Sequence, residues 1–76
     1  MMDKLNNKEI YFAQQVINDS TPGPYELKDL YGDLWDQVDS PTTFGARFKK
    51  TVEAGELEGI VWKDRRSNNH QVYEVL

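Results

Sequence analysis

Apolar positions follow two different periods along this chain, and the change of period divides it into a helical part and a strand part. Apolar residues return every three or four positions over residues 6–18 and again over residues 44–52, as in helices with one buried face. Over residues 60–63 and 72–75 the period falls to two, which is typical of strands. The pattern predicts helices followed by a β-hairpin.

The first predicted helix begins after Asn6 and runs to about Asn18. Asn6 with Glu9 three positions later forms a capping-box signature. The apolar arc of this helix is wider than one stripe, because Phe12 and Val16 extend it. Two interpretations stay open: the helix is held in a cleft between other elements, or Phe12 and Val16 form a homodimer contact.

Residues 19–24 read as a loop because they contain two prolines and a glycine. A very short strand is expected at residues 25–27, and Asp29 is a plausible N-cap for a second helix. Gly32 either weakens this helix or breaks the segment into two turns. The shared apolar face of the segment consists of Leu30, Tyr31, Leu34, Trp35 and Val38.

A third helix is predicted from Ser40 as N-cap with proline following at the first helical position. Phe44, Phe48 and Val52 define its buried stripe, and Gly55 is expected to end it in left-handed geometry. At 100° per residue, the opposite surface carries Thr42, Thr43, Ala46, Lys50 and Glu53, flanked by Arg47 and Lys49.

Charge is distributed unevenly along these elements. The net charge is −4 over 76 residues, yet residues 42–70 carry six basic and four acidic side chains. Residues 1–41 carry three basic and eight acidic ones. A polyanion would be attracted by the second part and repelled by the first.

Several chemistries are disfavoured by composition. The chain has no cysteine and one histidine, so thiolate metal sites and most nucleophilic triads are excluded. We expect no enzyme activity, no metal and no cofactor. No apolar run approaches the length of a membrane span, and 76 residues allow a single domain, expected in the cytoplasm.

The residues at 40–54 and 60–75 resemble the winged helix-turn-helix superfamily. More narrowly, residues 25–32 (YELKDLYG) and 44–50 (FGARFKK) are similar to a small uncharacterised family of single-domain proteins from Gram-positive bacteria and their phages. The resemblance covers about residues 25–76. It implies an α+β winged helix: three helices, a short strand and a C-terminal hairpin wing. It further implies a recognition helix in the DNA major groove and a wing on the backbone or minor groove.

The leading functional hypothesis is therefore duplex DNA binding in transcription regulation or DNA handling by a phage or mobile element. The candidate DNA-binding residues lie on helix three and the hairpin: Thr42, Thr43, Ala46, Arg47, Lys49, Lys50, Lys63, Arg65, Arg66, Asn68 and Asn69.

The alternative hypothesis is a protein-interaction module that keeps the winged-helix frame without binding DNA. A further interpretation is that aromatic side chains stack on the bases of a single strand, the candidates being Tyr25, Trp35, Trp62 and Tyr73. For Trp35 a position in the core is favoured. His70 is a lone imidazole near the predicted turn, so we expect no catalytic or metal-binding role for it.

Overall fold

The computed structural model describes residues 3–38, 40–67 and 70–76. Within these ranges the elements are α1 (Asn7–Asn18), β1 (Gly23–Tyr25), α2 (Leu27–Tyr31), a 3₁₀ helix η1 (Gly32–Gln37), α3 (Pro41–Glu53), β2 (Ile60–Arg65) and β3 (Gln71–Val75). The chain is an α+β protein with its helices packed against a small antiparallel sheet.

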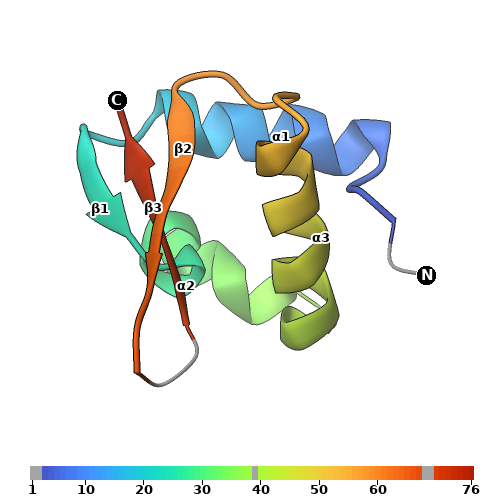
Figure 1. Ribbon diagram of the computed structural model, residues 1–76. Helices are drawn as coiled ribbons and strands as arrows, with labels where there is room; N and C mark the ends of the chain where they lie inside the picture. Colours follow the sequence, from blue (N-terminus) through green and yellow to red (C-terminus); the bar gives the residue numbers. More distant parts are fainter. Residues whose placement is uncertain (1–2, 39, 68–69) are drawn as a thin grey trace.

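The sheet has three strands in the order β1-β3-β2, so β3 is central and pairs with strands on both sides. In Figure 1 the sheet lies beside α3, and α1 crosses behind the upper end of the sheet. The hairpin strands are thus part of a sheet that also contains β1, rather than a free two-stranded ribbon.

The core lies between the sheet and the helices. Phe48 of α3 and Tyr73 of β3 are both fully buried, with ring centroids 5.0 Å apart in an edge-to-face arrangement. Ala13 and Ile17 of α1 belong to the same core cluster. The apolar spacing of α1 and α3 therefore predicted the buried faces correctly.

The helix ends follow the predicted caps in two of three cases. The capping box at Asn6 is formed, with Glu9 N donating to Asn6 Oδ1 at 2.8 Å and Asn6 N donating to Glu9 Oε1 at 2.9 Å. Pro41 begins α3 and Gly55 follows it with φ +75°, as expected, although the Ser40 side chain makes no capping hydrogen bond. The prediction for Asp29 was wrong, because the N-cap of α2 is Glu26, three residues earlier.

The expected strand at residues 25–27 is also misplaced. Strand β1 covers Gly23–Tyr25, and Leu27 already belongs to α2. Pro24 pairs with Glu74 of β3, although the local signal predicted a loop there. Proline is tolerated because β1 is an edge strand, which needs ladder hydrogen bonds on one side only.

Gly32 breaks the second helical segment, which confirms the alternative of two turns. Its φ of +58° ends α2, and η1 follows with a tighter winding. Because three rather than 3.6 residues make a turn there, Leu34 leaves the predicted buried face and is 37% exposed. Leu30 and Tyr31 remain in the core.

Candidate nucleic-acid interface

The outer face of α3 matches its predicted composition. Thr42, Thr43, Ala46 and Lys50 are exposed, while Phe48 and Val52 on the opposite side are buried. This follows from helical geometry, since residues about 180° from the core stripe must face solvent. The surface has short side chains at its centre, and Glu53 adds a negative charge near its C-terminal end.

Arg47 lies on the flank of α3 that contacts α1. Its guanidinium forms a bidentate ion pair with the Glu9 carboxylate, in which Nη1 donates to Oε2 at 3.2 Å and Nη2 contacts Oε1. Glu9 Oε1 also accepts from Asn6 N. The Glu9 carboxylate therefore takes part both in the N-cap of α1 and in the contact between α1 and α3. The second role could not be predicted from the sequence, because Glu9 and Arg47 are 38 positions apart.

Lys49 occupies the other flank of α3, next to β2. Its Nζ lies 5.1 Å from the ring centroid of Trp62, a cation–π contact. Trp62 Nε1 in turn donates to Gln71 Oε1 at 2.6 Å. The contact orients Lys49 at the boundary between the helix and the hairpin.

The hairpin strand β2 is longer than predicted. Asp64 and Arg65, expected in the turn, pair with Val72 and Gln71, and the register shifts between Trp62 and Asp64. The shift leaves Lys63 outside the regular pairing, where its Nζ lies 3.8 Å from Glu74 Oε1. The extension brings Arg65 onto an ordered strand.

Arg66 is directed toward the body of the protein. Its Nη1 lies 2.8 Å from Glu26 Oε2, and His70 Nδ1 lies 2.6 Å from Glu26 Oε1. The Glu26 side chain is only 7% exposed. The hydrogen bond with His70 holds the pKa of Glu26 below its usual range, and the nearby charges of Arg66 and Lys28 act in the same direction.

The sequence analysis named Arg66 as a candidate DNA contact, and it did not predict that Arg66 and His70 share an intramolecular partner. Both sides of the hairpin end are tied to the buried carboxylate of Glu26 at the start of α2. Glu26 itself was missed, because an isolated glutamate before a short helix carries no local signal. Asn68 and Asn69 lie outside the described residues.

The candidate residues fall into two groups by their electrostatic partners. Arg47, Lys63 and Arg66 are in ion pairs. Lys50 and Arg65 are exposed and make no ion pair within the described ranges. These two basic side chains have the fewest intramolecular constraints on reaching a ligand.

The four aromatic residues considered as stacking platforms are dispersed. Tyr73 is fully buried, so that role is wrong for it. Tyr25 uses its hydroxyl in hydrogen bonds to Thr21, and Trp35 packs edge-on against Tyr31 at 6.1 Å. Trp62, 41% exposed, lies on the sheet surface.

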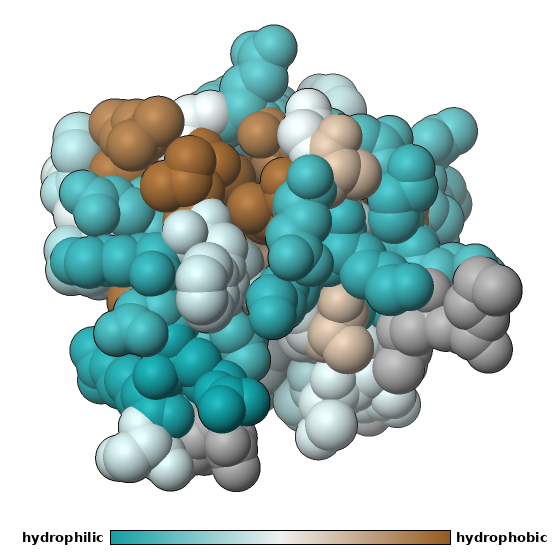
Figure 2. Space-filling view, in the orientation of Figure 1, coloured by the Kyte–Doolittle hydropathy of each residue, from teal (hydrophilic) through white to brown (hydrophobic). Residues whose placement is uncertain are grey.

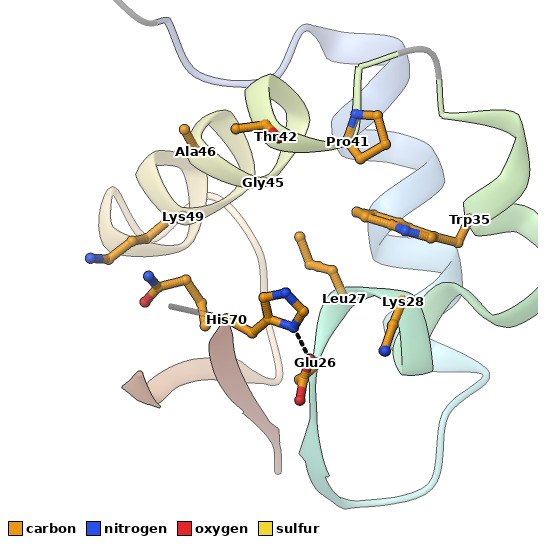
Figure 3. Close-up of a pocket in the computed structure, with 11 residues that line it drawn as sticks. Glu26, Leu27, Lys28, Trp35, Pro41, Thr42, Gly45, Ala46, Lys49 and His70 are labelled. Atoms are coloured by element: carbon orange, nitrogen blue, oxygen red, sulfur yellow. Dashed lines mark hydrogen bonds and ion pairs between the residues drawn. The ribbon is translucent and has the colours of Figure 1, made fainter. Parts of the chain in front are cut away.

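A groove separates the first half of α3 from the hairpin. We call it the α3–wing groove; it has a volume of about 600 Å³ and is lined by Glu26, Leu27, Lys28, Trp35, Pro41, Thr42, Gly45, Ala46, Lys49, His70 and Gln71. Figure 3 shows the Trp35 ring extending toward Pro41 and Leu27, with His70 turned to Glu26. Two elements of the candidate interface, α3 and the start of β3, thus share one concave surface with α2 and η1.

Figure 2 shows that the hydropathy of the molecular surface differs between the two ends of the sheet. Hydrophilic residues cover α3 and the lower end of the hairpin, whereas apolar residues gather at the upper end of the sheet. The exposed large apolar side chains include Val61, Trp62 and Leu76. The polar end of the sheet is the one that carries the candidate residues.

Comparison with known families places the chain in one of them. The model of a domain of unknown function, DUF1413, matches residues 13–74. The chain belongs to the DUF1413 family. No curated protein and no solved structure matches it. The expected membership of an uncharacterised family is confirmed, and the DUF1413 match runs from the second half of α1 through most of β3.

Two further properties of this DUF1413 chain concern its described residues. No group of three or more acidic or histidine side chains is arranged to hold a metal ion there. None of the described helices has the length and apolar character needed to cross a membrane.

Proposed function

We propose that this DUF1413 protein is a winged helix that binds duplex DNA through α3 and the β2–β3 hairpin. The element order of helix, strand, helix, helix, strand, strand supports the fold assignment. So does a sheet in which β1 lies beside β3, with the hairpin extending from it. The resemblance in residues 25–76 suggests a regulatory or DNA-handling role in a cytoplasmic setting.

The observation that carries the proposal is the composition and exposure of the outer face of α3. Small or hydroxyl side chains at Thr42, Thr43 and Ala46 allow a helix to approach base edges closely. Lys50 extends from the same face without an ion pair among the described residues, so it is available to a phosphate. Lys49 and Arg65 supply positive charge toward the hairpin.

The negative charge of the whole chain is compatible with this interface because much of the acidity lies elsewhere. Asp29, Asp33 and Asp36 belong to α2 and η1, and Glu9 is neutralised by Arg47. With a Debye length of about 8 Å at physiological salt, a bound phosphate is affected most by the charges nearest to it. Local rather than net charge therefore governs the interaction.

The test is salt-dependent binding to a fluorescein-labelled duplex of random sequence, measured by fluorescence anisotropy. The wild type should bind at low ionic strength, with log K falling linearly against log salt. Lys50→Gln should weaken binding and reduce the magnitude of that slope by about 1, the value for one lost phosphate contact.

A matched control distinguishes a contact from a change in net charge. Lys4→Gln alters the charge by the same amount at a side chain that pairs with Glu56, beyond the C-terminal end of α3, and should leave the slope unchanged. Equal effects of the two substitutions, or no duplex binding at low salt, would refute the proposal. The double variant Arg47→Ala with Lys50→Ala is a poor test, because Arg47 also anchors α1 to α3.

A second function, protein interaction without DNA, is favoured by one observation. Tyr11, Phe12 and Leu34 are 70%, 43% and 37% exposed on α1 and η1. A groove of about 540 Å³, lined in part by Phe12, Leu34 and Phe44, lies there. Val16, by contrast, packs against the core, so a homodimer through α1 would use Phe12 more than Val16.

Sedimentation equilibrium of the wild type and of Phe12→Ser tests this second function. A dimer dissociated by the substitution supports the α1 contact. A monomer at high protein concentration rules out self-association through this surface.

A further inference from the structure

The α3–wing groove has the size and the walls of a small-molecule site. Its volume of about 600 Å³ falls inside the range of roughly 300–1,000 Å³ usual for ligand pockets. The start of α2, η1, the first half of α3 and the start of β3 all contribute to its lining. A concave surface built from separate elements is more precise than a depression on a single helix.

One part of the groove is apolar and flat. Trp35 is half-buried and is held by edge-on contacts with Tyr31 and Phe44, each at 6.1 Å between ring centroids. Leu27 and Pro41 lie beside it in Figure 3. The held indole provides a surface against which a planar ring can pack.

The space above this apolar surface exists because α3 has small residues there. Positions 42, 45 and 46 are threonine, glycine and alanine on the side of α3 that lines the groove. A Cβ added at Gly45 would meet Leu27 Cδ1 at 3.8 Å, an ordinary contact, and no other heavy atom within 4 Å. Larger residues at these positions would fill the groove.

The polar part of the groove is cationic. Lys28 and Lys49 line it and lie on opposite sides of the view in Figure 3. His70 also lines it, paired with Glu26. Among the described residues that line the groove, Glu26 is the one acidic side chain, and it is compensated by both His70 and Arg66. The two lysines therefore determine the sign of the charge that a ligand meets.

We propose that the α3–wing groove binds a small aromatic anion. The aromatic body packs between Trp35 and Ala46, and the anionic group, a carboxylate, sulfonate or phosphate, is bound by Lys49. Lys49 Nζ contacts Trp62, which lies outside the groove, so the lysine would exchange this contact for the anion when the ligand binds. A neutral ring compound would leave the lysine charge uncompensated, and an aliphatic anion would forgo the aromatic contact.

Ligand binding in this groove has a consequence for the proposed function. Thr42, Ala46 and Lys49 belong to both the groove and the proposed DNA interface, so the anion would compete with the duplex. This consequence rests on the proposed function. The binding of the anion does not depend on the proposed function, because it is measured without DNA. Anion binding and DNA binding can therefore be refuted separately.

The experiment compares two fluorescent probes that share their rings and differ in charge. Anilinonaphthalene sulfonate carries a sulfonate, and phenylnaphthylamine is its neutral counterpart. The full chain should bind the sulfonate at one site per molecule and more tightly than the neutral probe. Lys49→Gln should weaken sulfonate binding about tenfold, as expected for loss of a charge-assisted contact, and leave the neutral probe unaffected.

Two further variants separate the groove from other surfaces. Ala46→Leu, at an exposed position where the fold should be retained, should abolish binding of both probes by filling the groove. Lys50→Gln makes the same change of charge one residue away but does not line the groove, so it should have no effect. Circular dichroism verifies that each variant is folded.

Three outcomes would overturn the proposal. They are equal affinity for the two probes, equal loss in Lys49→Gln and Lys50→Gln, and undiminished binding by a folded Ala46→Leu variant. The last result would place the probe on another apolar surface, such as the groove beside Phe12.

Discussion

Replacing Tyr73 by phenylalanine should stabilise this protein, although the same change usually destabilises. Tyr73 is fully buried, and its hydroxyl has no hydrogen-bond partner among the described residues. Burial raises the pKa of this phenol, with the charge of Glu53 adding to the effect, so the hydroxyl stays protonated at all physiological pH values. The fold therefore carries an unpaired donor in its core.

The magnitude follows from two opposing terms. A buried polar group without a partner costs about 1–3 kcal/mol, which phenylalanine removes. The void left by one oxygen, roughly 10 Å³, costs about 0.2 kcal/mol at about 24 cal/mol per Å³. The edge-to-face contact with Phe48 is kept in the variant. We expect a gain of about 1 kcal/mol, which would raise Tm by about 4–8 °C in a domain of this size.

Urea unfolding followed by far-UV circular dichroism measures the free energy of unfolding, with two tyrosines as comparisons. Tyr31→Phe should behave like Tyr73→Phe, because its buried hydroxyl is likewise unpaired among the described residues. Tyr25→Phe should destabilise by about 0.5–1.5 kcal/mol, since the Tyr25 hydroxyl donates to Thr21 O at 2.8 Å. The same chemical change should thus have opposite signs at two sites.

A loss of 1 kcal/mol or more in Tyr73→Phe would refute this reasoning. It would mean that the hydroxyl is satisfied in solution. Equal effects at Tyr73 and Tyr25 would equally show that burial and pairing do not control the outcome.

Three other substitutions test contacts between elements. Because the pKa of Glu26 is lowered in the folded state, its pairing stabilises the fold at pH values above the ordinary pKa of 4.5, and this stabilisation is lost as the pH falls through the lower folded-state pKa. Glu26→Gln should therefore reduce the loss of unfolding free energy at acidic pH, measured by urea unfolding at several pH values. An unchanged pH dependence would contradict the pairing. A double-mutant cycle with Glu9→Gln and Arg47→Gln should give a coupling of about 1 kcal/mol, and additivity would show no interaction. Gly55→Ala, at φ +75°, should cost about 1 kcal/mol, whereas Gly45→Ala in α3 should gain about 1 kcal/mol, so thermal melts should shift in opposite directions.

The extent of successful prediction differs between local and long-range features. The capping box at Asn6, the Phe48–Val52 face of α3 and the turn at Gly55 were all confirmed. Each depends on residues within about two turns of one another, whose spacing alone determines whether they can interact. The boundaries of β1 and β2 were wrong, because strand limits are decided by the pairing partner.

The candidate interface shows the same distinction. Which residues lie on the outer face of α3 follows from 100° per residue, so Lys50 and Ala46 were predicted to be exposed and are. Which basic groups are paired depends on acidic residues tens of positions away, such as Glu9 for Arg47 and Glu26 for Arg66. Charge counting treated all six as equivalent, and the structure separates them.

By itself the sequence determined that α1, α3 and a C-terminal hairpin form, which faces of α1 and α3 are apolar, and where positive charge is concentrated along the chain. These properties depend on local backbone preference and on period, which short stretches of chain contain completely. Only the tertiary structure decided that Arg66 and His70 converge on Glu26, and that α2, α3 and β3 enclose the α3–wing groove. Such features require segments up to 44 residues apart to meet, and that meeting is set by the packing of the core around Phe48 and Tyr73.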